Sequence, residues 1–112
     1  MKERHLLLFD DSIRTFILLD QDEYNIGRGL LNEIVLNGDP ISRIHARIRR
    51  SNCESNGGFQ YQIFDGISDE KPSKNGIFIN EVRRKEHILK TGDIIFFANI
   101  IKAVYVKENL SD

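Results

Sequence analysis

Hydrophobic residues recur along this chain in short runs, and polar or glycine-containing turns separate the runs. Between residues 59 and 64, Phe59, Tyr61 and Ile63 alternate with the other side chains, as in a strand whose two faces have different surroundings. No segment carries a sustained apolar stripe with the 3.6-residue period of a helix. The pattern predicts strands at residues 5–9, 13–19, 22–28, 34–36, 45–50, 59–64, 77–79, 86–89, 93–98 and 100–106.

Many short strands with frequent turns predict an all-β fold of two packed sheets, a β-sandwich, with a barrel as the alternative. We expect residues 51–58 to form a hairpin tip, because they are polar and end in two glycines. Residues 65–76 form a longer connection, and long loops in compact domains often carry function. The polar segment 107–112 is expected to fray.

The composition limits the possible classes of protein. A chain of 112 residues fits one domain, residues 1–112, with a core at about residues 5–106. The formal net charge of −1 gives no overall attraction to nucleic acid or to an anionic membrane, so any anion site has to be local. The longest apolar stretch, residues 94–106, is interrupted by Asn99 and Lys102 and is shorter than the roughly 20 residues of a membrane helix. The single cysteine, Cys53, excludes an internal disulfide and favours a reducing, cytoplasmic setting.

Three short motifs fall at predicted strand ends or in predicted loops. They are Gly27-Arg28, the segment Ser42-Arg43-Ile44-His45-Ala46, and the segment Ser73-Lys74-Asn75-Gly76. Together they supply two guanidinium groups, an ammonium group, hydroxyls and a carboxamide, and their glycines let backbone N–H groups approach a ligand closely. These groups suit a phosphate, which carries nearly two negative charges and three strong acceptor oxygens.

Each motif also has an ordinary structural interpretation. Arg28 can be a surface arginine at a strand end, Ser42 can cap a turn, and Asn75 before a glycine is first of all a turn signal. Ser42 and His45 do not suggest a catalytic pair, because residues three apart on an extended strand point to opposite faces. We expect His45 to be a buried imidazole whose ring nitrogens hold neighbouring loops together. Gly92-Asp93 is interpreted as a turn only.

Taken in order with Gly92-Asp93, the three motifs resemble the pattern of the forkhead-associated (FHA) domain, over about Glu23 to Phe97. The resemblance implies an eleven-stranded β-sandwich of two sheets, with a phosphothreonine-peptide site built from loops at one end. It also implies structural support of the site from Gly27, His45 and Gly76.

The same resemblance assigns a role to each candidate binding residue. Arg28 would contact the phosphate directly, and the Ser42 hydroxyl would donate to a phosphate oxygen. Arg43 lies where the family places another polar or basic contact. Lys74 occupies a position often held by threonine, and Asn75 would hold the loop and bond to the peptide backbone. The chain departs from the family pattern at Ile77, often a threonine, and in an insertion at residues 68–72.

The sequence therefore predicts a protein–protein interaction module of signalling or regulation, with no enzyme activity and no cofactor. The expected partner is a phosphothreonine-containing protein, a substrate of a Ser/Thr kinase, and we expect neither nucleic acid nor membrane as a partner and a monomeric state. The histidines and Cys53 lack the spacing of metal ligands, so no metal site is expected. The alternative hypothesis is a phosphate-independent β-sandwich scaffold that binds a partner through a sheet face.

Overall fold

The computed structural model describes residues 2–52 and 58–110, and this part of the chain folds into eleven strands without a helix. It therefore contains no helix that is long and apolar enough to cross a bilayer. The strands are β1 (Lys2–Phe9), β2 (Phe16–Leu19), β3 (Glu23–Gly27), β4 (Ile34–Val35), β5 (Ala46–Asn52), β6 (Phe59–Asp65), β7 (Ile77–Ile79), β8 (Val82–Arg84), β9 (Glu86–Ile88), β10 (Ile94–Phe97) and β11 (Ile101–Leu110). The expected hairpin tip lies mostly at residues 53–57, outside the described residues, as does Cys53.

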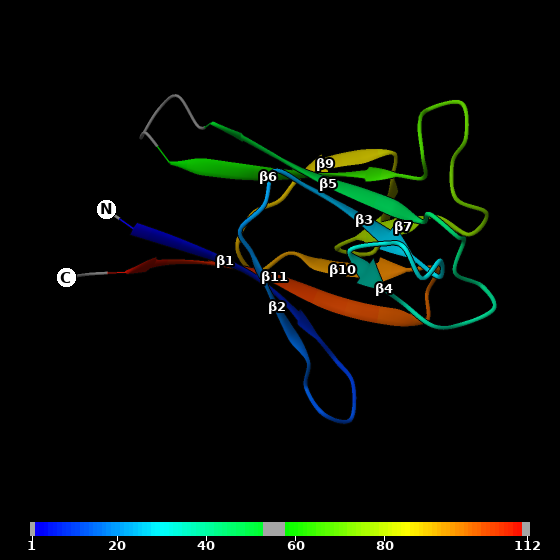
Figure 1. Cartoon of the computed structure of the whole chain (residues 1–112), viewed down its shortest axis with the longest axis horizontal. Coiled ribbons are helices and arrows are strands. Elements are labelled where there is room, and N and C mark those ends of the chain that lie inside the picture. Colours follow the sequence, from blue (N-terminus) through cyan, green and yellow to red (C-terminus); the bar gives the residue numbers. More distant parts are fainter. Residues whose placement is uncertain (1, 53–57, 111–112) are drawn as a thin grey trace.

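The strands form two sheets that pack face to face as a β-sandwich (Figure 1). The six-stranded sheet has the order β2-β1-β11-β10-β7-β8, and the five-stranded sheet has the order β4-β3-β5-β6-β9. Neighbouring strands run antiparallel except β3 and β4, which pair in parallel. The prediction of an all-β sandwich is confirmed.

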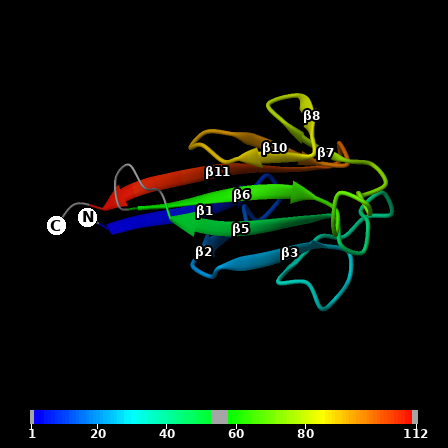
Figure 2. The ribbon, with the colours of Figure 1, turned by 90° about the horizontal axis from the view of Figure 1, so that it is seen from above.

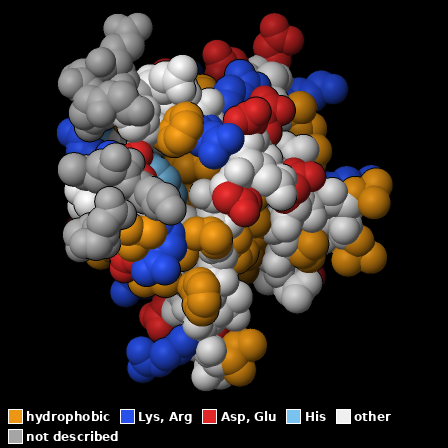
Figure 3. Space-filling model, turned by 60° about the vertical axis from the view of Figure 1, so that its left-hand side comes forward, with side chains coloured by type: hydrophobic (Ala, Val, Ile, Leu, Met, Phe, Trp, Pro, Cys, Tyr) orange, Lys and Arg blue, Asp and Glu red, His pale blue; other side chains and the backbone are white. Residues whose placement is uncertain are grey.

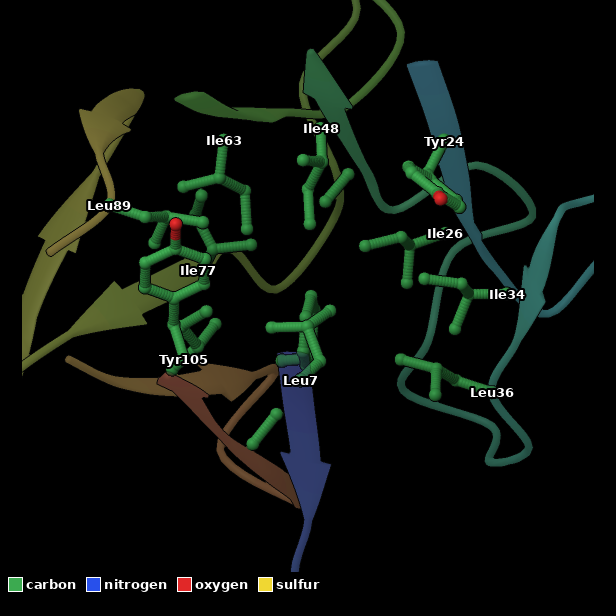
Figure 4. Close-up of a cluster of buried hydrophobic side chains, with 14 of the residues drawn as sticks. Leu7, Tyr24, Ile26, Ile34, Leu36, Ile48, Ile63, Ile77, Leu89 and Tyr105 are labelled. Carbon is green, nitrogen blue, oxygen red and sulfur yellow. The ribbon is translucent and has the colours of Figure 1, made fainter. Parts of the chain in front are cut away.

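Alternate side chains of facing strands fill the space between the sheets. Leu7 of β1 and Tyr105 of β11 point toward Ile48 of β5 and Ile63 of β6, and all four are at most 1% exposed (Figure 4). Isoleucine dominates this core because a β-branched side chain packs well on a pleated sheet. Burial raises the pKa of Tyr105 and raises that of Tyr61, another core residue, to about 12. Both phenols are therefore neutral and hydrogen bonded in the core at physiological pH.

The loops that carry the three motifs lie at one end of the sandwich, and the termini lie at the other. β1 and β11 pair along their whole common length, from Lys2 opposite Leu110 to Phe9 opposite Ala103. Both ends of the chain therefore leave side by side, as two views of the molecule show (Figure 1, Figure 2). The loops after β3, before β5 and after β6 meet at the opposite end, because β5 runs antiparallel to both β3 and β6.

Three local expectations were wrong. β2 begins at Phe16 instead of residue 13, because Arg14 has a φ of 54° and its N–H bonds to Asp11 in a tight turn. β8 was missed because Val82 is its only apolar residue and all its residues are exposed. It forms a hairpin with β7 through Asn80 and Glu81, whose positive φ values suit a two-residue turn.

The third error concerns the C-terminal segment, of which residues 107–110 are described and belong to β11 instead of fraying. The Lys107 ammonium lies 2.9 Å from a carboxylate oxygen of Glu3, and the other oxygen accepts the Phe59 N–H. The Phe59 N–H and then Lys107 hold the pKa of Glu3 below its ordinary value. Lys107 and Glu108 of this segment thus have charged partners, Glu3 and Arg4, which the composition alone did not reveal.

Candidate functional site

The loop after β3 and the loop before β5 are joined through their backbones. The N–H of Arg28 donates to the carbonyl of Ser42 at 3.0 Å, and the N–H of Gly29 donates to the carbonyl of Arg43 at 3.1 Å. Gly27 packs against this contact, because a Cβ atom at this position would stand 2.3 Å from the Arg43 carbonyl oxygen. Only glycine allows the two loops to approach so closely.

The Arg28 side chain is exposed, but its guanidinium is held in place. Its Nε–H donates to the carbonyl of Ile41 at 3.0 Å. Among the described residues, no group accepts a hydrogen bond from its two terminal nitrogens. The fork that can bind two oxygens of one anion is thus oriented by the protein and still available.

Ser42 connects two loops through its hydroxyl. The backbone N–H of Lys74 donates to Ser42 Oγ at 3.0 Å, which joins the loop after β6 to the loop before β5. The hydroxyl accepts this bond, so its own hydrogen can be donated outward. The side chain of Lys74 itself is exposed.

Asn75 fastens the same two loops at a second point. Its Nδ2 donates to the carbonyl of Pro40 at 2.8 Å. In the described part of the chain, its Oδ1 accepts no hydrogen bond, so this oxygen can receive an N–H from a bound peptide.

These contacts bring Arg28, Ser42 and Asn75 to one short segment. Residues 40–42 accept a hydrogen bond from the Arg28 guanidinium, from the Lys74 backbone and from the Asn75 carboxamide. Three separate parts of the sequence therefore meet there. Arg43 contributes its backbone carbonyl to this junction, and its exposed side chain has no polar partner within the described residues.

His45 lies behind the loops and is fully buried. Its Nδ1 accepts the N–H of Ser42 at 3.0 Å, and its Nε2 lies 2.7 Å from the carbonyl oxygen of Gly76. An imidazole that accepts at Nδ1 and donates at Nε2 is neutral. The ring meets the backbone of Ser42 and not the hydroxyl, so the two residues do not form a nucleophile and base.

Gly76 completes the third motif. Its φ of 83° lies in the left-handed region that favours glycine. Its N–H donates to the Ser73 hydroxyl at 2.9 Å, and the same hydroxyl lies 2.5 Å from a carboxylate oxygen of Asp65. Ser73 thus closes the base of the loop between β6 and β7.

Sequence reasoning assigned no role to Asn32, which lies in the loop after Arg28. Its Nδ2 donates to the carbonyls of Gly29 and Arg43 at 2.8 and 2.7 Å. Asn32 therefore fixes the turn that follows Arg28, whose tip is Leu30-Leu31, 86% and 97% exposed. The glycine and asparagine three positions apart could have indicated this turn.

Asp93 does more than form a turn. Its carboxylate accepts hydrogen bonds from the Lys90 N–H and from the Asn80 carboxamide, and it lies 2.9 Å from His87 Nε2. Burial alone would raise the pKa of Asp93, but the hydrogen bonds outweigh burial and hold this pKa below its ordinary value. The cluster stabilises the start of β10, away from the motif loops.

Within residues 2–52 and 58–110, no cluster of histidine and acidic side chains has the arrangement of a metal site. The chemistry available at the motif loops is that of anion binding: an oriented guanidinium, a hydroxyl donor and a free amide oxygen.

Comparison with known proteins identifies the family. Residues 24–98 match the family model of the FHA domain. The chain belongs to the FHA domain family. The match spans the strands and loops that carry all four motifs, which confirms the resemblance seen in the sequence.

One relative of the FHA domain described here is a kinase, the ovarian-specific serine/threonine-protein kinase Lok of Drosophila melanogaster. The two are 31% identical over 104 residues, which is 83% of this chain and 20% of Lok. The chain spans between 14% and 20% of the length of the curated relatives that it matches.

Solved structures agree with the fold. The Slr1951 protein of Synechocystis has a TM-score of 0.79 and 32% identity, and the match covers 94% of this chain and 97% of that one. The yeast Dun1 FHA domain, solved with a doubly phosphorylated peptide, has a TM-score of 0.74 and 21% identity. That match covers 97% of this chain and 79% of that one.

Proposed function

We propose that this FHA domain binds phosphothreonine-containing segments of partner proteins through Arg28, Ser42, Arg43, Lys74 and Asn75. The observation that carries the proposal is the convergence on residues 40–42, which receive hydrogen bonds from Arg28, Lys74 and Asn75. A phosphate bound beside this segment meets donors that are already oriented, which lowers the entropy lost on binding.

Each group has a distinct part in this proposal. The Arg28 fork binds two phosphate oxygens, and the Ser42 hydroxyl donates to a third position on the phosphate. The Asn75 Oδ1 accepts a backbone N–H of the peptide. Arg43 and Lys74 have exposed cationic side chains, which add attraction to the phosphate and to acidic neighbours in the peptide.

His45, Gly27 and Gly76 support the site without touching the ligand. Gly27 permits the close approach of the loops after β3 and before β5, and the His45 ring bonds to the loops before β5 and after β6. The same arrangement explains why the binding groups need no ligand to become ordered.

The comparisons support this function. The yeast Dun1 FHA domain was solved with a phosphothreonine peptide, and the MEK1 FHA domain was solved with a phosphothreonine peptide of HOP1. FHA domains serve as interaction modules, so we assign binding and not catalysis to residues 1–112 as one domain.

Several finer statements belong to the same proposal. The partner is a substrate of a Ser/Thr kinase, because such enzymes produce phosphothreonine. A cytoplasmic setting fits a chain with one cysteine. A net charge of −1 argues against nucleic acid as the partner. In a gel retardation assay, we therefore expect the protein not to slow the migration of DNA or RNA.

The test begins with an oriented phosphopeptide library, followed by calorimetric titration of the best peptide in phosphorylated and bare form. Arg28→Ala should lower affinity by about ten- to a hundredfold, since a hydrogen bond to a charged group contributes about 1.5–3 kcal/mol. Arg49→Ala is the matched control, because Arg49 is an exposed arginine of β5 that pairs with Glu23. Affinity should also weaken with salt and below about pH 6, where the phosphate gains a proton.

The rival hypothesis is the phosphate-independent scaffold. It predicts equal affinity for phosphorylated and bare partner and no loss with Arg28→Ala. Either result would defeat the proposed phosphothreonine site.

A further inference from the structure

The outer face of the six-stranded sheet carries a broad apolar band, where a β-sandwich ordinarily turns polar side chains to water. The Arg4–Glu108 pair and Lys102 border this band. In register across β2, β1, β11 and β10, two neighbouring rows of hydrophobic side chains cover this face. One row is Leu18, Leu6 and Val106, and the other is Phe16, Leu8, Val104 and Ile94. Figure 3 shows hydrophobic side chains at the surface between charged ones on the side that carries the termini.

β2 is the open edge at which both rows end. Within the described residues it pairs only with β1, so one side of its backbone has no strand partner there. Its sequence, Phe-Ile-Leu-Leu, contains none of the lysines or prolines that commonly protect an edge strand from pairing with another chain. Phe16 and Leu18 are 65% and 46% exposed.

The register with β1 shows which backbone groups of β2 are free. The carbonyl of Thr15 accepts the N–H of Phe9, so the odd-numbered residues of β2 direct their backbone groups toward β1. Phe16 and Leu18 therefore direct their N–H and C=O groups to the open edge. A strand that pairs here has to place its own outward-facing residues opposite these two.

A second copy of β2 satisfies this condition in antiparallel orientation. With Ile17 on a two-fold axis, Phe16 lies opposite Leu18 of the other copy, and the two exchange both backbone hydrogen bonds. Beyond the paired strands, the turn that holds Arg14 comes near Asp20 of the other copy, so opposite charges approach each other at both ends of the junction.

We propose that two copies of this chain pair through their β2 strands in this register. Each row of outer-face apolar side chains then continues across the junction into the other copy. Ile17 of each copy lies on the inner side of the sheet, where it lines a groove of about 470 Å³ between β2 and β4. This pairing replaces the monomer expected from the sequence.

The two-fold axis also fixes how the motif loops are arranged. Because the paired strands are antiparallel, the motif loops of the two copies point in opposite directions. Two phosphate sites of one pair could therefore not bind neighbouring phosphothreonines of one short peptide. The proposal itself does not depend on phosphate binding.

Cross-linking tests the register directly. In a Cys53→Ser background, Ile17→Cys should form a disulfide between two copies under mild oxidation, because the axis brings the two side chains together. Phe16→Cys should cross-link with Leu18→Cys when the two proteins are mixed, and much less with itself. Self-linking of Phe16→Cys alone, or failure of Ile17→Cys to link, would overturn the register.

Sedimentation of the otherwise unmodified chain tests the pairing. We expect dimer to appear between about 10 µM and about 1 mM, the range expected of a small interface. Leu18→Lys should abolish it, and Ile94→Lys, a matched change on the same face but away from the edge, should not. A monomer throughout this range, or loss of dimer with both variants, would overturn edge pairing; the second result would indicate packing of the faces instead. Thermal melting of each variant checks that it is folded.

Discussion

The backbone N–H of Lys74 donates a hydrogen bond of 3.0 Å to the hydroxyl oxygen of Ser42. The bond crosses from the loop after β6 to the loop before β5. It uses an acceptor position of the hydroxyl and leaves the hydrogen available. The same atom can thus join two loops and, in the proposed function, donate to a phosphate.

Ser42→Ala removes both interactions. We expect the affinity for the phosphopeptide to fall about tenfold or more, because a bond to a charged group contributes about 1.5–3 kcal/mol. Ser42→Thr keeps the hydroxyl and should retain most of the affinity. Isothermal titration of both variants measures this, and unchanged binding of Ser42→Ala would remove the residue from the site.

Gly27→Ala should disturb the junction of the loops. The new Cβ would stand 2.3 Å from the Arg43 carbonyl oxygen, so the backbone has to shift. Overpacking of this kind typically costs about 1–3 kcal/mol of unfolding free energy. Gly29→Ala is the milder comparison, because its Cβ would meet the flexible Arg43 side chain at 2.9 Å. Urea unfolding should show the larger loss for Gly27→Ala; equal losses would contradict the argument.

His45→Phe keeps a buried ring but leaves the Ser42 N–H without its partner. The carbonyl of Gly76 still accepts the Ala98 N–H. We expect a loss of about 1–3 kcal/mol in unfolding free energy, the range for one unsatisfied buried group. Peptide affinity should fall as well, because the loop positions loosen. Nitrogen NMR of the unmodified protein should show the neutral Nε2–H tautomer, and the opposite tautomer would contradict the hydrogen bonds described.

Asp93→Asn should change the dependence of stability on pH. The folded-state pKa of Asp93 is lowered, so its ionised form stabilises the fold above its unfolded pKa, near 3.8. This contribution to stability is lost as the pH falls through the lower pKa that Asp93 has in the folded state. Urea unfolding should therefore show the variant less stable at pH 7 and closer to the unmodified protein below about pH 4.

The exposed carboxylate Asp69 provides the control, since Asp69→Asn removes a charge from the loop after β6. We expect the stability curve of this variant to follow that of the unmodified protein. A constant difference between Asp93→Asn and the unmodified protein from pH 2 to 7 would show that the carboxylate charge has no such role.

Much of the fold could be predicted because its signals are local. Isoleucine-rich runs such as β7 and the glycine turn at Gly76 are visible in a short window of sequence. β8 could not be found this way, because its pairing with β7 needs no apolar side chain. Its turn uses Asn80 and Glu81 where glycine would have been the recognisable signal.

The binding residues of the site could be predicted, but the residues that support its loops could be predicted only in part. The motifs named the residues that meet at residues 40–42, because each motif contains chemistry suited to an anion. Asn32 and Ser73 were not assigned roles, because Asn32 bonds to Arg43 in another loop and Ser73 bonds to Asp65 at the far end of a long one. Short polar residues in turns are common, and only the tertiary structure separates those that join loops from those that face water.

The pairing of Lys2 with Leu110 has a consequence for how such a module can be attached. A polypeptide joined at either end departs from the rear of the sandwich, opposite the motif loops. Because the entry and exit points are neighbours, the unit can be inserted into a surface loop of another protein without forcing that loop apart. The end that carries the motif loops would then project freely from the host, however bulky the host is.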